Sequence, residues 1–526
     1  MDPPIWKRTL PFLPVVAVCL ASTYFGDIHS RTSLDFNHWG LIYSSAVDLL
    51  DGRMPFRETY EIYGLLSAGL NAVGLVMLGE TIVSVGRITA FFYATNLLLA
   101  YLIARRFLDP WTAVFVPVLT FLVHPYIAFP WPNYASYTFY LLGVYFLLGP
   151  GRHALLLGGF LFGLSLLARQ TIGVSTLPVA AVFVGLKWWQ QRNARTARQE
   201  SASRFVLGAI LPLAAFFVFL LSFDLLGEWA RQSFGINATL LSYLEDRNEY
   251  HSSFDFIGPF ISNVYLGERT SMRSVTLVLI AWLSTGYILG HSIRAIRRGR
   301  PTDRDIAYIL VALSSLLAFN QGLHLFKLFR FASGISLGFI LIATATQSLC
   351  GLVFAHKRRA AIVVLVVAAT ALSTNVLDNP EIAGRSRIPS QFLRLELEPY
   401  QGPVKPLRGS RWSKKHKRLE RLQASLERSA RCGLRTFVNT ADDPLAPYLV
   451  EGLEKAQREA GRRPRRLSDE VFPEEVARRK DLLKQGAAIL LAGPLTPIPK
   501  NYRVVGSVEG GKVAVPEGCL DLPDPG

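Results

Sequence analysis

Long apolar blocks separated by shorter polar stretches dominate the hydrophobic pattern of this chain. Eleven apolar runs follow one another between residues 9 and 372. Apolar runs of this kind predict helices that lie within a membrane. The runs cover residues 9–25, 88–104, 111–123, 137–148, 154–168, 173–186, 205–226, 275–293, 306–319, 332–349 and 360–372. The pattern therefore predicts a polytopic α-helical membrane protein with about eleven transmembrane helices.

A polar segment, residues 27–87, separates the first apolar run from the second. It is too polar and too interrupted to cross a bilayer, and its glycine-rich part, residues 63–79, is at the short limit for a span. We therefore expect a first outer loop with juxtamembrane helices at the membrane surface. Carboxylates stand between aromatic residues along this loop, among them Asp35, Asp48, Asp51, Glu58 and Glu61.

Lysine and arginine gather on one side of the predicted helices. If the N-terminus is cytoplasmic, the basic stretches at residues 105–106, 152, 187–198, 294–304 and 357–359 all fall inside. This distribution obeys the positive-inside rule, and eleven spans then place the C-terminal region outside. The sequence thus predicts a multi-pass protein of the bacterial inner (plasma) membrane with a cytoplasmic N-terminus.

The composition changes after the last apolar run. Residues 377–431 are polar and rich in Pro and Arg, which predicts a linker between a transmembrane domain at 1–376 and a soluble domain at 432–526. The soluble domain is expected to be a small extracytoplasmic α/β fold. Its predicted elements are a strand in GLRTFVNT, helices at residues 443–461 and 474–485, a strand in AAILLAG and a hairpin in YRVVGSVEGGKVAVPEGC. On the outer side of the membrane, Cys432 and Cys519 could form a disulfide.

The overall composition agrees with a membrane protein. Of the 526 residues, 50% are hydrophobic and only 18% are charged, which is below the roughly 25% usual for soluble domains. The formal net charge of +17 would suggest a nucleic-acid partner if the protein were soluble. Here much of the Lys and Arg lies in short loops between apolar runs, so membrane topology is the better explanation. The sequence shows no nucleic-acid-binding motif.

Three features of the N-terminal part follow one another in a recognisable order. Asp35 lies ten residues after Phe25, an amphipathic segment at residues 38–50 leads into LLDGRMPFRETYEIYG, and LGETIVSVGRITAFF enters the second apolar run. This order resembles the GT-C superfamily of membrane glycosyltransferases. The nearest branch is that of the protein O-mannosyltransferases and the lipid A aminoarabinose transferases. The resemblance covers residues 1–190 well and the remainder only in topology.

The resemblance implies a polyprenyl-phosphate-linked sugar as donor and a lipid, glycan or protein acceptor outside the membrane. It maps the catalytic base onto Asp35, because an acceptor hydroxyl or amine must lose a proton as it attacks the anomeric carbon. From the residues alone, Asp35 could equally be the N-cap of the helix that follows it. Glu61 is the candidate for a second catalytic acid that contacts the acceptor or a metal.

The sequence argues against a metal held by paired carboxylates. Many members of the family carry two adjacent acids at this point, whereas here Phe36 follows Asp35. A divalent metal therefore stays an open alternative, and no other cofactor is expected.

Basic residues on the outer side are candidates for binding the donor phosphate. They are exceptions to the positive-inside rule, and a departing lipid phosphate needs charge stabilisation. Arg87 could instead be a snorkelling interfacial anchor, and His38 could be an interfacial packing histidine. The predicted substrate-binding residues are His38, Arg57, Tyr63, Arg87, Arg169, His324, Lys327 and Arg330.

The residues and the resemblance together predict a membrane glycosyltransferase that transfers a hexosyl or pentosyl group on the extracytoplasmic side. The sequence has no glycine-rich phosphate loop, dinucleotide fingerprint or serine-hydrolase elbow, which fits a lipid-linked donor. Two alternatives stay open: a transporter or flippase of lipid-linked sugars, and a non-catalytic scaffold for envelope assembly. The first is weakened because no two-fold repeat of the kind found in transporters is visible in the sequence.

Overall fold

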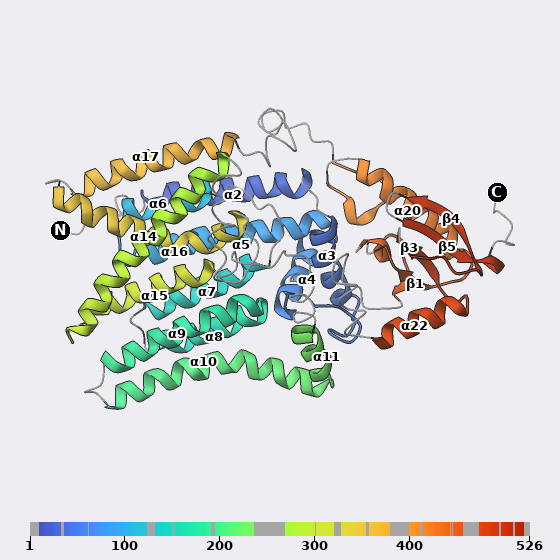
Figure 1. The fold of residues 1–526 in the computed structure, drawn as a ribbon, viewed down its shortest axis with the longest axis horizontal. Coiled ribbons are helices and arrows are strands. Elements are labelled where there is room, and N and C mark those ends of the chain that lie inside the picture. Colours follow the sequence, from blue (N-terminus) through green and yellow to red (C-terminus); the bar gives the residue numbers. More distant parts are fainter. Residues whose placement is uncertain are drawn as a thin grey trace. The chain divides into compact units, whose positions relative to one another are not determined.

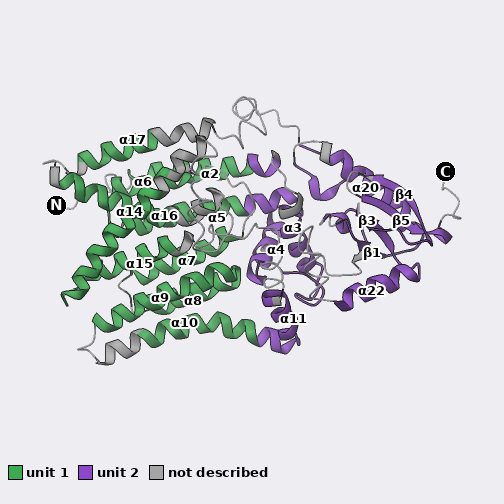
Figure 2. Ribbon diagram, viewed as in Figure 1, with its two compact units in different colours: residues 1–27, 89–217, 250–395 green, residues 28–88, 218–249, 396–526 purple. Residues whose placement is uncertain are grey.

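The computed structural model describes residues 10–32, 36–61, 63–123, 132–149, 151, 153–190, 195–235, 269–299, 301–319, 328–353, 357–378, 399–410, 414–441, 443, 445–455, 473–493, 496–508 and 511–519. The chain forms two compact units, coloured separately in Figure 2, and each unit combines distant parts of the sequence. Unit 1 comprises residues 1–27, 89–217 and 250–395, and unit 2 comprises residues 28–88, 218–249 and 396–526.

Unit 1 is a bundle of helices (Figure 1). Each apolar run predicted from the sequence lies mainly on one helix, although the run at 205–226 continues beyond the end of its helix at Ser222. The helices are α2 (Phe12–Thr32), α5 (Ile82–Ala104), α6 (Pro110–Val123), α7 (Asn133–Leu147), α8 (Ala154–Ala168), α9 (Gln170–Gln190), α10 (Arg195–Ser222), α14 (Arg269–Arg297), α15 (Asp303–Phe319), α16 (Leu328–Val353) and α17 (Lys357–Asp378). One end each of α2, α5 and α10 belongs to unit 2.

Within the described residues, four helices are long and apolar enough to cross a membrane. They cover residues 12–31, 82–104, 170–190 and 202–222. Several other helices of the bundle are apolar but shorter, including residues 110–122 and 154–168. The helical character predicted for this region is therefore confirmed, whereas the number of eleven spans stays a prediction.

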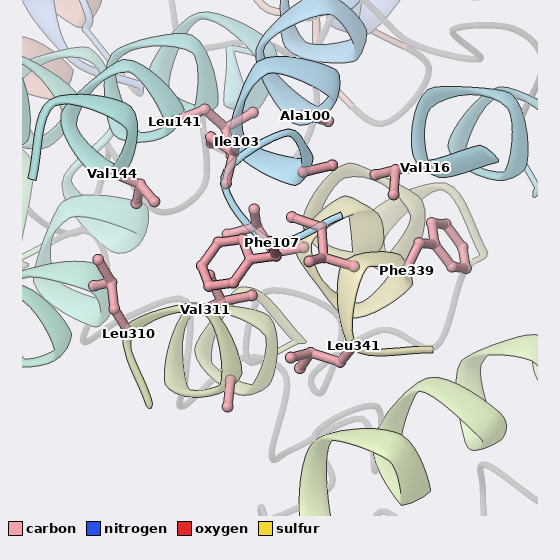
Figure 3. Close-up of a cluster of buried hydrophobic side chains, with 14 of the residues drawn as sticks. Ala100, Ile103, Phe107, Val116, Leu141, Val144, Leu310, Val311, Phe339 and Leu341 are labelled. Carbon is pink, nitrogen blue, oxygen red and sulfur yellow. The ribbon is translucent and has the colours of Figure 1, made fainter. Parts of the chain in front are cut away.

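The core of unit 1 lies where α5, α6, α7, α15 and α16 meet (Figure 3). Ile103, Val116, Leu141, Val311 and Phe339 are almost completely buried there, each contributed by a different helix. Lipid tails are as apolar as these side chains, so in a membrane the helices are held together mainly by close van der Waals packing.

Two glycines allow α8 and α10 to approach each other closely. A Cβ on Gly159 would collide with the carbonyl oxygen of Phe205, and a Cβ on Gly208 would collide with that of Leu156. Small residues at such contacts are typical of packed membrane helices. Replacing either glycine by alanine would force the two helices apart.

Unit 2 contains a five-stranded sheet with the strand order β2-β1-β3-β5-β4. β1 (Thr436–Asn439) pairs in parallel with β2 (Glu454–Lys455) and with β3 (Ile489–Ala492). β5 (Gly511–Pro516) runs antiparallel to β3 and to β4 (Tyr502–Val508). The strands in GLRTFVNT and AAILLAG and the two strands of the hairpin lie where the sequence placed them, and α22 (Pro473–Lys484) matches the second predicted helix.

One segment of this region differs from the sequence prediction. The sequence predicts a helix at residues 443–461, but its described part forms only the 3₁₀ turn η4 (Ala446–Tyr448) and the short strand β2. Pro447 lies within the turn, and Gly452 has a φ of 78°, in the left-handed region. A proline and a left-handed glycine five residues apart do not permit a continuous helix.

A second difference concerns the predicted linker. Residues 414–430 form the helix α20 (Lys414–Ala430). Leu419, Leu422 and Leu426 recur at helical spacing and are buried in the core of unit 2, where α20 contacts β4 and β5. Most residues of this segment are charged or polar, so its composition suggested a linker. The spacing of its leucines is nevertheless that of a helix with one narrow apolar face.

The first outer loop folds together with the C-terminal sheet in unit 2. It forms α3 (Phe36–Leu50) and α4 (Leu65–Leu78), which cover the predicted amphipathic and juxtamembrane segments. Trp39, Tyr43 and Leu75 belong to the same buried cluster as apolar residues of α20 and of the sheet. The structure thus groups residues 28–88 with the C-terminal region, instead of dividing the chain at single boundaries along the sequence.

Polar contacts tie the same parts together. The Tyr448 hydroxyl donates a hydrogen bond to Asp48 Oδ1 at 2.8 Å, and Asp48 is almost completely buried. Lys405 forms an ion pair with Glu80 at 3.1 Å. Cys432 and Cys519 form a disulfide with their Cα atoms 5.5 Å apart, and it links the end of α20 to the residues after β5.

An ion pair joins α20 to the segment that follows β1, and its acidic partner is buried. Asp443 Oδ2 accepts a hydrogen bond from Arg418 at 2.8 Å, and Asp443 Oδ1 accepts one from the Leu445 N–H at 3.1 Å. Burial raises the pKa of the Asp443 carboxyl, although Arg418 and the N–H groups of Leu445 and Ala446 act in the opposite direction. The effect of desolvation on the pKa of Asp443 is therefore larger than the opposite effect of its hydrogen-bond partners.

We expect Asp443→Asn to change the pH dependence of unfolding in a defined direction. The folded-state pKa of Asp443 lies above the ordinary value of 3.8, so its contribution to stability is present at low pH and is lost as pH rises through the folded pKa. As pH rises through that interval, wild type should lose stability that the variant keeps. The stability of the variant relative to wild type should therefore increase with pH and then stay constant at higher pH. Unfolding midpoints measured from acidic to neutral pH check this, with the exposed Asp481→Asn as control. A difference that stays constant across pH would contradict it.

Candidate active site

Several predicted site residues lie outside the described part of the chain. These are Asp35, His324 and Lys327. His38 lies on α3 and Arg330 lies on α16, but the structure does not describe the side chains of these two residues. The geometry of the site therefore rests on Arg57, Glu61, Tyr63, Arg87 and Arg169.

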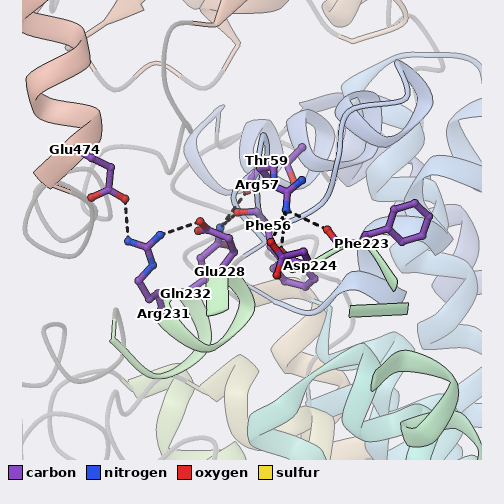
Figure 4. Close-up of polar contacts among 9 residues, drawn as sticks. All are labelled: Phe56, Arg57, Thr59, Phe223, Asp224, Glu228, Arg231, Gln232 and Glu474. Atoms are coloured by element: carbon purple, nitrogen blue, oxygen red, sulfur yellow. Dashed lines mark hydrogen bonds and ion pairs between the residues drawn. The ribbon is translucent and has the colours of Figure 1, made fainter. Parts of the chain in front are cut away.

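The chain between α3 and α4 folds into a tight polar loop (Figure 4). Phe56 is buried and has a φ of 63°, a left-handed conformation that is uncommon for a residue with a Cβ. Thr59, Tyr60 and Glu61 are also buried. A buried loop in an unusual conformation needs hydrogen-bond partners from elsewhere in the fold.

Gln232 supplies those partners. It lies on the π-helical turn η1 (Arg231–Gly235), in the loop that follows α10, and it is almost completely buried. Its amide Nε2 donates to the carbonyl oxygens of Phe56 at 2.6 Å and Thr59 at 3.2 Å. Its Oε1 accepts the backbone N–H of Glu61 at 3.1 Å. One side chain thus holds three backbone groups of the loop.

Glu61 is held by this arrangement. Its side chain is only 7% exposed, and its Oε1 accepts a hydrogen bond from the Thr59 hydroxyl at 3.0 Å. With the Thr59 hydroxyl on its carboxylate and Gln232 on its backbone, Glu61 has a fixed position. A buried carboxylate in a defined orientation is a suitable acid or base for chemistry.

Arg57 contacts the end of a helix. Its guanidinium donates to the carbonyl oxygens of Phe223 at 3.0 Å and Asp224 at 2.8 Å, just after α10 (Figure 4). It also lies 3.9 Å from the Asp224 carboxylate. Carbonyl groups at a helix C-terminus lack partners within the helix, so these bonds have a structural purpose. Binding of substrate by Arg57 stays a prediction.

A second arginine connects the same region to the helix α22. Arg231 pairs with Glu228 and with Glu474, both at 2.8 Å. Glu474 lies in the first turn of α22, so the ion pair reaches from η1 to a helix of the C-terminal part of unit 2 (Figure 4). The turn that carries Gln232 is therefore held both by the loop between α3 and α4 and by α22.

Three further candidates, Tyr63, Arg87 and Arg169, are also described. Tyr63 is half-buried against the core of unit 2, and Arg87 is half-buried on α5. Arg169 separates α8 from α9 in unit 1, where its Nε donates to Thr171 Oγ1 at 3.1 Å. Their part in substrate binding stays a prediction.

Among the described residues, no group of three or more His, Cys, Asp or Glu side chains could hold a metal ion. The Thr59 hydroxyl and the Gln232 amide contact Glu61, and neither of them is a carboxylate. We therefore derive no catalytic step through a metal.

Comparison with known proteins adds a fold-level finding. No protein-family model and no curated protein matches the chain. The crystal structure of ArnT from Cupriavidus metallidurans in the apo state matches with a TM-score of 0.57 and 14% identity, covering 98% of this chain and 100% of that one. ArnT is a lipid A aminoarabinose transferase, a GT-C superfamily member. This chain has the same fold as ArnT.

Two further structures are similar. ArnT from Cupriavidus metallidurans bound to undecaprenyl phosphate has a TM-score of 0.55 and 15% identity over 98% of this chain and 100% of that one. The apo oligosaccharyltransferase of Archaeoglobus fulgidus has a TM-score of 0.49 and 12% identity, covering 93% of this chain and 70% of that one. The ArnT match confirms the fold that the first-loop motifs imply, and this fold likeness covers 98% of the chain.

Proposed function

We propose that this protein is an integral membrane glycosyltransferase that uses a polyprenyl-phosphate-linked sugar. It transfers the sugar to a lipid, glycan or protein acceptor on the extracytoplasmic face of a bacterial inner membrane. The observation that carries the proposal is the fold likeness to ArnT over 98% of the chain. One of those ArnT structures holds undecaprenyl phosphate, a lipid of the class that the first-loop motifs imply as donor carrier.

The proposed reaction is a displacement at the anomeric carbon of the donor. The acceptor oxygen or nitrogen forms the new bond and loses its proton to Asp35, while the bond to the polyprenyl phosphate breaks and that phosphate leaves with the electron pair. Cationic side chains stabilise the charge that develops on the departing phosphate. The proposed ligands of donor and acceptor are His38, Arg57, Tyr63, Arg87, Arg169, His324, Lys327 and Arg330.

Glu61 is the proposed second acid. Its burial and its bonds to Thr59 and Gln232 support this assignment, because a catalytic carboxylate must be held within a fraction of an ångström of its working position. Contact with the acceptor is the role we assign to it.

The disulfide between Cys432 and Cys519 supports an extracytoplasmic position for the C-terminal sheet. Disulfides persist on the oxidising side of the bacterial inner membrane and are rare in the cytoplasm. This agrees with the orientation inferred from the basic loops.

Sugar transfer from defined donors tests the proposal. Purified protein is given a panel of polyprenyl-phosphate-linked hexoses and pentoses together with membrane lipid extracts as acceptors. Consumption of one donor, with release of polyprenyl phosphate, supports the transferase. If the donors bind but none is consumed, a flippase is favoured. If no donor binds, a scaffold is favoured.

A further inference from the structure

One exposed face of α20 carries a row of arginines. Arg421, Arg428 and Arg431 are all exposed, and Ala424 is exposed between the first two. The Arg431 N–H donates to the Arg428 carbonyl oxygen at 3.3 Å, so the turn after Ala430 continues the helix. Residues spaced by seven and three positions lie on the same face of a helix. These three arginines are called the basic stripe below, and the proposed transfer reaction does not use them.

The acidic residues of α20 do not neutralise the basic stripe. Glu420 accepts a hydrogen bond from the Tyr400 hydroxyl at 2.9 Å, and Glu427 accepts one from the Gln423 amide at 2.8 Å. Among the described residues, no carboxylate forms an ion pair with any of the three stripe arginines. A surface that serves only solubility usually mixes charges of both signs. A row of one sign therefore favours an anionic partner.

The packing of α20 holds the basic stripe in place. Leu419, Leu422 and Leu426 on the other side of the helix are buried in the core of unit 2. The helix contacts β4 and β5, and it lies beside them in Figure 1. Cys432, the residue after Arg431, is held by the disulfide. Binding groups that are fixed in advance lose little conformational freedom when a partner binds.

The surface of this part of unit 2 is polar. Among the described residues between 399 and 519, Val504 is the one large hydrophobic side chain that is exposed. Protein interfaces usually have aromatic or aliphatic anchors at their centre, and peripheral membrane binding combines basic charge with inserted apolar side chains. The described residues of this region offer neither arrangement. A hydrated and strongly polar partner, such as a glycan, therefore fits the surface better.

The spacing within the basic stripe indicates how the charges of the partner are distributed. Arg428 and Arg431 are one turn apart and can contact the same acidic group. Arg421 lies two turns before Arg428, a separation of about 10.5 Å along the axis at ~1.5 Å per residue. This separation is close to the length of a disaccharide. Acidic side chains on one face of an extended peptide repeat every second residue, or about every 7 Å, which fits less well.

We propose that the basic stripe binds an extracytoplasmic anionic glycan that carries one carboxylate or phosphate per disaccharide. The guanidinium groups of Arg428 and Arg431 donate to one acidic group, and that of Arg421 donates to the next. The proposal rests on the extracytoplasmic position proposed for the C-terminal sheet and does not depend on the transfer reaction. Glycan binding can therefore be measured whether or not a sugar donor is consumed.

Binding of a fluorescently labelled hyaluronan octasaccharide to the detergent-solubilised full-length protein tests the proposal. Hyaluronan carries one carboxylate per disaccharide, and fluorescence polarisation measures its affinity. The stripe variant, Arg421→Gln/Arg428→Gln/Arg431→Gln, should bind it about tenfold more weakly, because three exposed ion pairs each contribute modestly. A disaccharide-phosphate oligomer of the same charge, used in parallel, shows whether a carboxylate or a phosphate is preferred.

A charge-matched control separates the basic stripe from the net charge of the protein. Arg478 and Lys480 on α22 and Lys500 before β4 are also exposed. Replacing these three by glutamine removes the same charge, yet the affinity for hyaluronan should stay within about twofold of wild type. Both variants keep every basic residue of unit 1, so a difference between them reports on the stripe. Higher ionic strength should weaken binding of wild type and control more than that of the stripe variant.

Several outcomes would overturn the proposal. Equal losses in the stripe variant and the control would mean that only net charge matters. Tighter binding of a peptide of alternating Glu and Ser, with the same number of carboxylates, would make the partner an acidic peptide. Loss of bound phosphatidylglycerol from the stripe variant in native mass spectrometry, with hyaluronan binding retained, would make the surface a membrane contact. Unchanged affinity of the stripe variant for both glycans would leave the arginines as a solvated helix face.

Discussion

Replacing Asp35 by asparagine should lower the turnover of a polyprenyl-phosphate-linked sugar by about 10²- to 10⁴-fold, the usual contribution of a general base. Asparagine has the same size as aspartate but cannot take the proton that the attacking acceptor must lose. It is as good a helix N-cap as aspartate, so α3 should still begin normally. Donor binding, measured separately by native mass spectrometry or equilibrium binding, should be retained.

The matched control for Asp35→Asn is Glu58→Gln. Glu58 is an exposed carboxylate in the same loop, and it accepts the Met54 N–H at 2.6 Å, a bond that glutamine can also accept. Activity of this variant should stay within about twofold of wild type, as for most surface changes. Full activity in Asp35→Asn would contradict the proposed base and would mean that Asp35 serves only as a helix cap. A loss of donor binding in the same variant would instead point to a substrate-binding role.

Replacing Gln232 by alanine should lower kcat by about 10²-fold, because a displacement of about 1 Å at a reacting group has an effect of that size. The variant loses the bonds to Phe56, Thr59 and Glu61, so the left-handed backbone at Phe56 is no longer held and Glu61 can shift. KM for the donor should change little, because Gln232 is a positioning residue in the proposed mechanism. Steady-state kinetics on the donor found active in wild type measure both constants.

A double-mutant cycle shows whether Gln232 acts through Glu61. Glu61→Gln keeps an acceptor for the Thr59 hydroxyl but removes the carboxylate, so it should lower kcat strongly without unfolding the loop. If the two residues act as one unit, the double variant should be little worse than Glu61→Gln alone. Additive effects would mean that Gln232 serves catalysis by another route. Gln423→Ala, which removes an exposed glutamine–glutamate contact on α20, is the control and should keep full activity.

The same residues show how far sequence reasoning reached. The order of motifs in the first outer loop pointed to the GT-C superfamily, and the likeness to ArnT confirms the fold that this resemblance implies. Glu61 was chosen from that resemblance, and the structure places it in a buried loop with fixed partners. Gln232 was not foreseen. It lies 171 residues from Glu61 along the chain, and a glutamine in a polar loop carries no periodic signal.

Arg57 and α20 also show where prediction from the sequence alone fails. A basic residue in an outer loop suggests a phosphate ligand, but only the fold brings the Phe223 and Asp224 carbonyl groups to its guanidinium. The charges of α20 suggested a linker, and only its packing on β4 and β5 reveals that its three leucines are a core stripe. In both cases the local composition is compatible with two structures, and long-range contacts select one.

The sequence by itself determined the helices of unit 1, the hairpin, the strands β1 and β3 and the family resemblance. These features depend on periodicity, turn chemistry and motif order, which are properties of neighbouring residues. Only the tertiary structure decided that the first outer loop shares a core with the C-terminal sheet and that Gln232 holds Glu61. Such contacts join residues as far apart as Asp48 and Tyr448, which are separated by 400 positions. Their energies arise from burial and hydrogen-bond satisfaction in the folded chain, and no local pattern encodes them.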